Sequence, residues 1–240
     1  MKELSMPRSL ADQTEAELGG PRSVLSLQRR DHQVLDALLV RIGDSVGDAR
    51  REALTALCRL VFPHAFAEEA VLWPLVRRVL PDGEELTLRV EQEHQEINQL
   101  FTELESLDAD SLDHRRLFGR IEALLRQDVR DEEDVLLPKL QEALDAQTLR
   151  RLGWAWLAVR VTAPTRPHPT VARRLPGNAL AAVPLAPLDR SRDRLDRAAR
   201  RAPGRWAAGC AHVSRALALA AGAVEHLPPL RRGEHPSTRT

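Results

Sequence analysis

The sequence contains no tyrosine, only two cysteines, and aromatic residues at just 3% of its 240 positions. Cys58 and Cys210 have no partner at a metal-binding spacing, so a cysteine metal site is excluded and a disulfide framework is not indicated. No segment approaches the roughly 18 apolar residues of a membrane span, and the N-terminus lacks a signal-peptide hydrophobic run. We therefore expect a cytoplasmic protein without membrane contacts.

The zero net charge hides two regions of opposite sign. Residues 1–159 contain 20 basic and 30 acidic side chains, whereas residues 160–240 contain 15 arginines and five acids. The second region also holds 10 of the 16 prolines, which is typical of an extended linker. We divide the chain into a flexible segment 1–21, an acidic domain 22–158 and a Pro/Arg-rich extension 159–240.

Apolar residues recur at helical spacing through the acidic domain. The pattern predicts helices over about 22–44, 48–80, 84–107 and 111–146, with short connections between them. No alternating strand pattern competes. Helices of this length joined by short loops predict an all-α, up-down-up-down four-helix bundle. In the extension, only two short helices are expected, near 187–201 and 205–226, and the last ten residues are expected to be disordered.

The chain contains an internal repeat. The segment "HAFAEEAVLWPLV" (64–76) returns 64 residues later as "DVRDEEDVLLPKL" (128–140), with aspartate in place of the histidine. A second pair, "RRDHQVLDAL" (29–38) and "VEQEHQEINQLF" (90–101), places an acid before a histidine and a glutamine after it. The domain therefore consists of two copies of one helical hairpin.

Polar residues interrupt each apolar stripe near its middle. Buried carboxylates are costly unless they are paired or bind metal, and residues at i and i+4 share one helix face. Imidazole and carboxylate together suit iron, manganese or zinc. The sequence therefore predicts a metal site whose ligands are His32, His64, Glu68, His94, Asp128 and Glu132.

These motifs resemble the haemerythrin-like proteins with an HHE cation-binding domain, over about residues 22–145. The resemblance implies a non-haem di-iron centre inside the bundle, with O2, NO or peroxide as the small ligand. Asp128 departs from the pattern, which has histidine at this position. The resemblance also leaves a choice between Glu132 and Glu133, and we prefer Glu132 because Glu68 indicates the i+4 position in the first repeat.

Several alternatives remain open at this point. The site can be a modified di-iron centre, a single-metal site on His32, His64, Glu68 and His94, or a degenerate fold kept for another purpose. The function can be ligand binding or sensing, an enzymatic activity of the peroxidase, catalase or iron-centre repair type, or a metal-free regulatory scaffold. The neighbouring Glu69 and Glu133 are expected to be solvated or to contact a ligand rather than the metal.

The remaining features predict no further site. The histidines outside the stripes are expected to be ordinary surface or tail residues: His114, His168, His212, His226 and His235. The "GWAW" segment (153–156) is expected to pack at the end of the bundle. The basic extension has no recognisable nucleic-acid module, so we expect it to fold onto the acidic domain instead.

Overall fold

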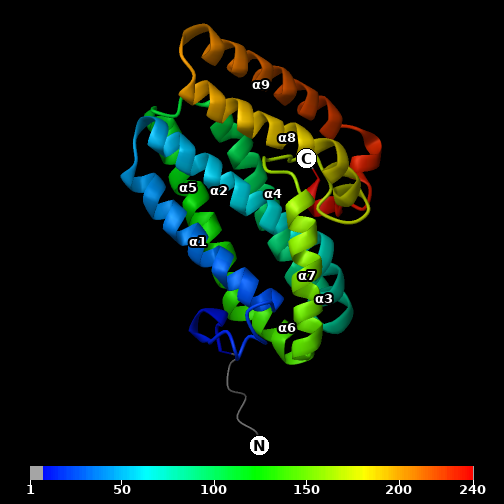
Figure 1. The fold of residues 1–240 in the computed structure, drawn as a ribbon. Helices are drawn as coiled ribbons and strands as arrows, with labels where there is room; N and C mark the ends of the chain where they lie inside the picture. Colours follow the sequence, from blue (N-terminus) through cyan, green and yellow to red (C-terminus); the bar gives the residue numbers. More distant parts are fainter. Residues whose placement is uncertain (1–7, 240) are drawn as a thin grey trace, which may run out of the picture.

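The computed structural model describes residues 8–239, and within that range every regular element is helical. The long helices α1 (Val24–Asp44), α2 (Gly47–Ala67), α4 (Gly83–Ser106) and α5 (Leu112–Asp131) lie alongside one another (Figure 1). α1 packs against α2, and α4 packs against α5, as two hairpins. The predicted all-α class is confirmed.

The helix starts follow from capping side chains. Ser23 accepts a hydrogen bond from the backbone N–H of Leu25 at the start of α1, and Ser111 accepts one from His114 at the start of α5. Such caps satisfy N–H groups that have no partner within the helix. They fix where α1, the first helix of one hairpin, and α5, the second helix of the other, begin.

Both glutamate-bearing helices contain a π-helical turn that the 3.6-residue pattern does not predict. η2 (Glu68–Leu72) leads into α3 (Trp73–Val79), and η3 (Glu132–Leu136) leads into α6 (Leu137–Ala143). Each turn closes with a hydrogen bond to the glutamate carbonyl from the N–H five residues later. Pro74 and Pro138 follow directly and have no N–H, so the regular ladder is interrupted at the same place in both repeats.

Two apolar clusters fill the interior on either side of a polar layer. On α1, His32 lies between Leu25 of one cluster and Leu35 of the other. The cluster toward the α1–α2 loop includes Leu39, Ile42, Leu57, Phe101 and Ile121. The opposite cluster includes Leu72, Trp73, Val90, Leu136 and Trp156. The polar layer is therefore enclosed by apolar side chains at both ends.

The sequence pattern missed a helix, α7 (Ala146–Thr162). It starts at an Asp145 cap and packs against α1, α2 and η2. Gly153 permits a close approach, because a Cβ there would lie 2.1 Å from the carbonyl oxygen of Arg22. Trp156 is fully buried whereas Trp154 is 58% exposed. The "GWAW" segment therefore covers the side of the polar layer rather than only the end of the domain.

The N-terminal segment is ordered where the structure describes it. Leu10, at the start of the short helix η1 (Leu10–Asp12), and Leu18 are fully buried in the second apolar cluster. Flexibility was predicted for residues 1–21, and residues 1–7 of that range lie outside the described part. For residues 8–21 the prediction fails, because two leucines anchor the chain.

The C-terminal extension is more helical and better packed than its composition suggests. α8 (Gly177–Arg201) and α9 (Gly204–Glu225) form an antiparallel hairpin, followed by η4 (Pro228–Arg231) and η5 (Pro236–Thr238). α8 begins ten residues earlier than predicted and contains Pro184 and Pro187. η5 contacts α4 and buries Thr238, so the predicted terminal disorder is wrong for residues 231–239, and residue 240 lies outside the described part.

Two buried aspartates of α8 explain why the proline-rich residues 163–176 are fixed. Asp189 accepts hydrogen bonds from the backbone N–H groups of Thr165 and Arg166 at 3.0 and 3.1 Å. Asp193 accepts one from the Thr165 hydroxyl and pairs with the Arg166 guanidinium. The backbone polar groups of this loop are thus satisfied inside the protein.

The basic extension also makes the expected contacts with the acidic domain. Arg174 pairs with Glu84 at 2.8 Å and with the fully buried Glu91 at 2.7 Å, and Arg166 pairs with Glu105 at 3.1 Å. These contacts join the loop that precedes α8 to α4.

One helix in the described residues, α9, is long and apolar enough to cross a membrane by length and composition alone. Its mean hydropathy is 1.3 over an 18-residue window, of which 11% is buried. The prediction that no segment reaches this length overlooked α9, because Arg215 interrupts its apolar run.

Candidate metal centre

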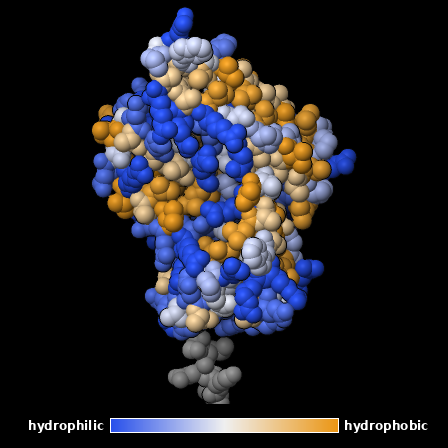
Figure 2. Space-filling model, viewed as in Figure 1, coloured by the Kyte–Doolittle hydropathy of each residue, from blue (hydrophilic) through white to orange (hydrophobic). Residues whose placement is uncertain are grey.

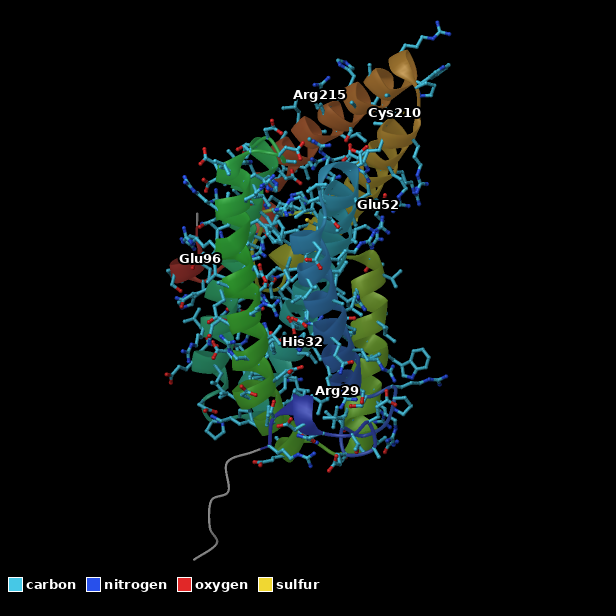
Figure 3. All side chains as sticks on the ribbon, turned by 90° about the vertical axis from the view of Figure 1, so that its left-hand side faces the viewer. Arg29, His32, Glu52, Glu96, Cys210 and Arg215 are labelled. Atoms are coloured by element: carbon cyan, nitrogen blue, oxygen red, sulfur yellow. The ribbon has the colours of Figure 1, made fainter. Side chains whose placement is uncertain are left out.

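The polar layer contains two groups of side chains whose ligand atoms converge. The first group consists of His32 on α1, His64 on α2 and Glu132 on η3, whose ligand atoms all lie within 4.8 Å of one another. His32 Nε2 lies 3.3 Å from His64 Nε2 and 3.2 Å from Glu132 Oε2. Figure 3 shows His32 pointing from α1 into the interior.

The second group consists of Glu68 on η2, His94 on α4 and the same Glu132, again within 4.8 Å. His94 Nε2 lies 3.7 Å from Glu68 Oε2. Glu68 also reaches the first group, because its Oε1 lies 3.2 Å from His64 Nε2. The two groups therefore share Glu132 and adjoin through Glu68, an arrangement that suits two neighbouring metal ions.

Five of the six predicted ligands belong to these groups, and Asp128 does not. It is buried on α5, with Oδ1 3.7 Å from His94 Nε2. Its carboxylate also contacts Glu93, whose pKa rises to about 7 through burial and the negative charge of Asp131. Asp128, Glu93 and Asp131 thus form a second layer of carboxylates beside the centre.

Each histidine is oriented by a carboxylate on its other nitrogen. His32 Nδ1 lies 2.8 Å from Glu133, His64 Nδ1 lies 3.0 Å from Asp31, and His94 Nδ1 lies 3.0 Å from Glu69. All three Nε2 atoms consequently face the shared space. Metal-binding histidines usually donate their second N–H to a carboxylate or carbonyl in this way.

Sequence reasoning identified these supporting carboxylates only in part. Glu69 and Glu133 are buried, so the option that they are solvated is wrong, and the option that they contact a ligand histidine is what the structure shows. The sequence pattern assigned no such role to Asp31. The feature that could have indicated it is the acidic residue directly before the histidine in both copies of the second repeat.

The π-helical turns explain how consecutive glutamates serve one centre. On a regular helix, adjacent side chains point about 100° apart, which would direct one of each pair outward. Here Glu68 and Glu69 are both at most 1% exposed, and Glu132 and Glu133 are 1% and 8% exposed. The wider turn brings both members of each pair inside.

Proton affinities in the layer reflect these ion pairs. Burial alone would lower the pKa of His32, but hydrogen bonds to Glu132 and Glu133 raise it to about 9. Burial opposes protonation of His94 as well, and Asp128 and Glu69 raise its pKa to about 10. Burial raises the pKa of Glu132, whereas the imidazolium of His64 lowers that of Glu68 despite its burial. The layer thus holds positive charge in the place that metal ions would take.

Three buried carboxylate oxygens in this layer have no hydrogen-bond partner among the described residues: Glu68 Oε2, Asp128 Oδ1 and Glu132 Oε1. Buried polar atoms are nearly always satisfied, so such a cluster requires a partner. A divalent cation supplies one, and the mixed nitrogen and oxygen donors suit iron, manganese or zinc. The residues therefore fit metal ions.

A small cavity of about 20 Å³ adjoins the imidazoles. This is sufficient for about one water-sized molecule. Its polar wall contains His32, His64, His94 and Asp128, and its apolar wall is formed by Leu35, Leu60, Val61, Phe62, Ile97, Leu125 and Val129. A small, uncharged ligand matches this lining.

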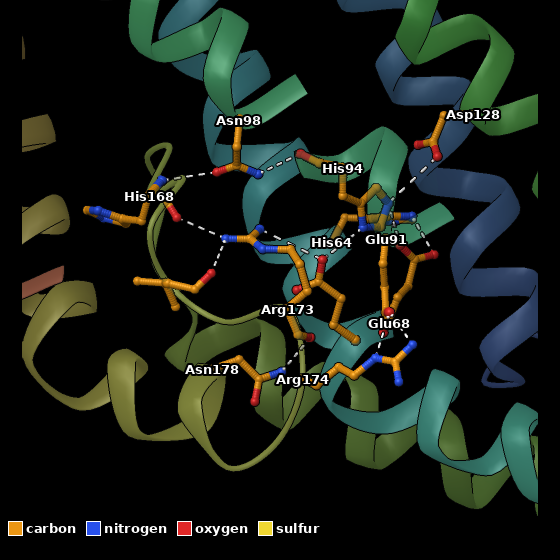
Figure 4. Close-up of polar contacts among 12 residues, drawn as sticks. His64, Glu68, Glu91, His94, Asn98, Asp128, His168, Arg173, Arg174 and Asn178 are labelled. Atoms are coloured by element: carbon orange, nitrogen blue, oxygen red, sulfur yellow. Dashed lines mark hydrogen bonds and ion pairs between the residues drawn. The ribbon is translucent and has the colours of Figure 1, made fainter. Parts of the chain in front are cut away.

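The C-terminal extension reaches the same layer from the other side of α4. Figure 4 shows the loop at His168 beside Asn98, which hydrogen bonds to the backbone of His94. Arg173 is buried and lies 3.8 Å from Glu69 Oε1. The extension therefore contributes to the surroundings of His94.

A protein-family model described as the hemerythrin HHE cation binding domain matches residues 23–140. Residues 23–140 belong to this family. An uncharacterized hemerythrin-like protein of Schizosaccharomyces pombe is 22% identical over 135 residues. That match covers 56% of this chain and 66% of the relative, slightly less than two thirds of its length. No solved structure matches the chain significantly.

The haemerythrin-like domain thus ends before α7 and the extension, although both contact its polar layer. Two histidines that were expected at the surface are not there: His114, which is not a predicted ligand, and His168, which lies outside the matched residues. His168 and His114 are buried rather than on the surface, whereas His212 and His226 are exposed as expected. His114 lies away from the polar layer, and His168 binds Asp189 and Glu225.

Proposed function

We propose that this haemerythrin-like chain holds a non-haem di-iron centre and binds or senses O2, NO or peroxide. The observation that carries the proposal is the pair of buried histidine and carboxylate groups that share Glu132. We interpret α1, α2 with α3, α4, and α5 with α6 as the four-helix bundle around this centre.

In this proposal His32 and His64 would hold one ion and His94 the other, and Glu68 and Glu132, which lie near the histidines of both groups, would supply carboxylate oxygens. Asp128 belongs to neither group, but we include it as the sixth ligand because its Oδ1 has no hydrogen-bond partner and lies 3.7 Å from His94 Nε2. Bound iron would supply a reversible change of oxidation state and an open coordination position for a small ligand.

The chain's own residues prepare the site for that chemistry. Glu133, Asp31 and Glu69 hold the three imidazoles by their Nδ1 atoms and keep Nε2 directed inward. The apolar clusters on both sides limit the entry of water. The apolar wall of the adjoining cavity favours O2 or NO over charged molecules.

A second function, peroxide turnover, is favoured by the position of Asp128. Aspartate is shorter than histidine and lies outside both groups, so a coordination position at the His94 side would stay accessible. Binding and turnover differ in their products. Consumption of hydrogen peroxide by the iron-loaded protein, reduced in Asp128→His, would favour turnover, whereas reversible spectral changes with O2 or NO would favour binding.

The proposal is tested by anaerobic reconstitution with ferrous iron followed by metal analysis and optical spectra with each ligand. We expect about two iron ions per chain and a spectrum that changes with O2, NO or peroxide. Glu85→Gln, an exposed change of the same type, is the control for Glu132→Gln. A protein that binds no iron under these conditions would refute the proposal.

A further inference from the structure

The outer face of α9 is apolar and has no partner within the described residues. Only Ser214 and Ala221 of the 22-residue helix are buried, while Trp206, Val213 and Leu219 are 67%, 47% and 78% exposed. Figure 2 shows hydrophobic residues along this helix at the surface. Exposed His212 and Arg215 interrupt this face, but most of its exposed residues are apolar, which indicates an interaction surface.

A basic tip adjoins this face. The end of α8 and the start of α9, residues 194–205, contain five arginines and one acid. The arginines are Arg194, Arg197, Arg200, Arg201 and Arg205. The acid, Asp196, already pairs with Arg166 at 2.5 Å. The hairpin projects beyond the rest of the molecule in Figure 3, and Arg194, Arg201 and Arg205 are exposed and accessible to a large partner.

The five arginines form no ion pair with any described residue, although elsewhere the extension's arginines pair with acids of α4 and α8. Arg205 instead lies over the ring of Trp206, 5.8 Å from its centroid. Unpaired positive charge beside an exposed tryptophan and an apolar helix is the pattern of a segment that lies in a lipid interface.

We propose that the α8–α9 hairpin docks on an anionic lipid surface, with the apolar face of α9 in the interface and the arginine tip among the headgroups. The charge complementarity selects this partner. A second copy would offer no counter-charge on α9, whose one acid, Glu225, is already bound to His168. A nucleic acid would pair with the arginines but leave the apolar face in water.

The expected effect of each arginine follows from lipid electrostatics. A basic residue near an anionic membrane contributes roughly a five-fold gain in affinity, and the gain decreases within about 8 Å at physiological salt. Arg194, Arg201 and Arg205 are exposed, so replacing them by glutamine leaves the packing intact. The triple substitution should weaken binding by roughly 100-fold.

The test measures binding of the full chain to vesicles of phosphatidylcholine with and without phosphatidylserine, by co-sedimentation and tryptophan fluorescence. We expect binding to the anionic vesicles, roughly 100-fold loss in R194Q/R201Q/R205Q, and a clear loss in Leu219→Gln. The matched control R78Q/R89Q/R151Q removes the same charge from α3, α4 and α7 and should bind as the wild type does.

Three results would overturn the proposal. One is absence of binding to anionic vesicles at low salt. Another is equal loss in the control triple variant, which would show that only the total charge matters. The third is wild-type vesicle affinity in Leu219→Gln together with tight binding to duplex DNA or a changed oligomer mass, which would assign the surface to nucleic acid or to a second copy.

Discussion

His168 links α8 to α9, because its two ring nitrogens face a carboxylate on each helix. Its Nε2 lies 3.1 Å from Asp189 of α8 and its Nδ1 lies 3.4 Å from Glu225 of α9. Burial alone would lower the pKa of this imidazole, but the hydrogen bonds to Asp189 and Glu225 raise it from 6.5 to about 9. The folded protein therefore keeps a proton on His168 at neutral pH.

The consequence for stability follows from the two proton affinities. Below pH 6.5 both the folded and the unfolded chain are protonated at His168, and the full stabilisation is present. As pH rises from 6.5 to about 9, only the folded chain holds the proton, so stability falls. At about 1.4 kcal/mol per pKa unit, the total loss is about 3 kcal/mol.

The assay is urea denaturation of the wild type and His168→Gln at about pH 6 and about pH 9.5. We expect the variant to be less stable at the lower pH by about 3 kcal/mol more than at the higher pH. His212→Gln changes an exposed histidine and should match the wild type at both values. An equal difference between His168→Gln and the wild type at both pH values would show that His168 is neutral in the fold, and the reasoning would be wrong.

Three further substitutions test the surroundings of the centre. Arg173→Met removes the cation beside Glu69 and should speed iron release to a chelator by roughly 10- to 100-fold, because groups that orient metal ligands affect affinity on this scale. Gly153→Ala forces a Cβ against the Arg22 carbonyl and should cost about 1–3 kcal/mol in urea denaturation. Asp128→His restores the imidazole of the family pattern and should change both the iron occupancy and the optical spectrum.

Each of these expectations has a contradicting result. If Arg173→Met releases iron at the same rate as Arg151→Met, which changes an exposed arginine, the extension does not influence the metal centre. Wild-type stability in Gly153→Ala would mean that α7 is not packed closely on the start of α1. An unchanged occupancy and spectrum in Asp128→His would show that Asp128 is not a ligand.

The helical repeat was sufficient to predict which residues face the polar layer. Spacing at i and i+4 places His64 and Glu68 on one face, and the second copy places Glu132 opposite them. The structure brings these residues together with His32 and His94. It leaves Asp128, which was also predicted as a ligand, outside both groups, with Oδ1 3.7 Å from His94 Nε2.

The same reasoning could not predict the role of the second glutamate in each pair. It assumed 3.6 residues per turn, which directs Glu69 and Glu133 away from Glu68 and Glu132. The π-helical turns bring all four inside. The only local signal is the proline six residues after the first glutamate, at 74 and 138.

The extension was predicted poorly because composition does not reveal long-range partners. Proline-rich sequence indicates a linker when its backbone is solvated. Here Asp189 and Asp193, more than 20 residues later in the chain, bind the backbone and side chains of residues 165 and 166. No local pattern in the sequence connects these positions.

The central claim is that the two histidine and carboxylate groups hold two iron ions through a shared Glu132, and metal analysis tests it most directly. Reconstituted wild type and Glu85→Gln should each bind about two iron ions per chain, whereas Glu132→Gln should lose both ions, since both groups include this carboxylate. Equal iron content in Glu132→Gln and the wild type would contradict the account.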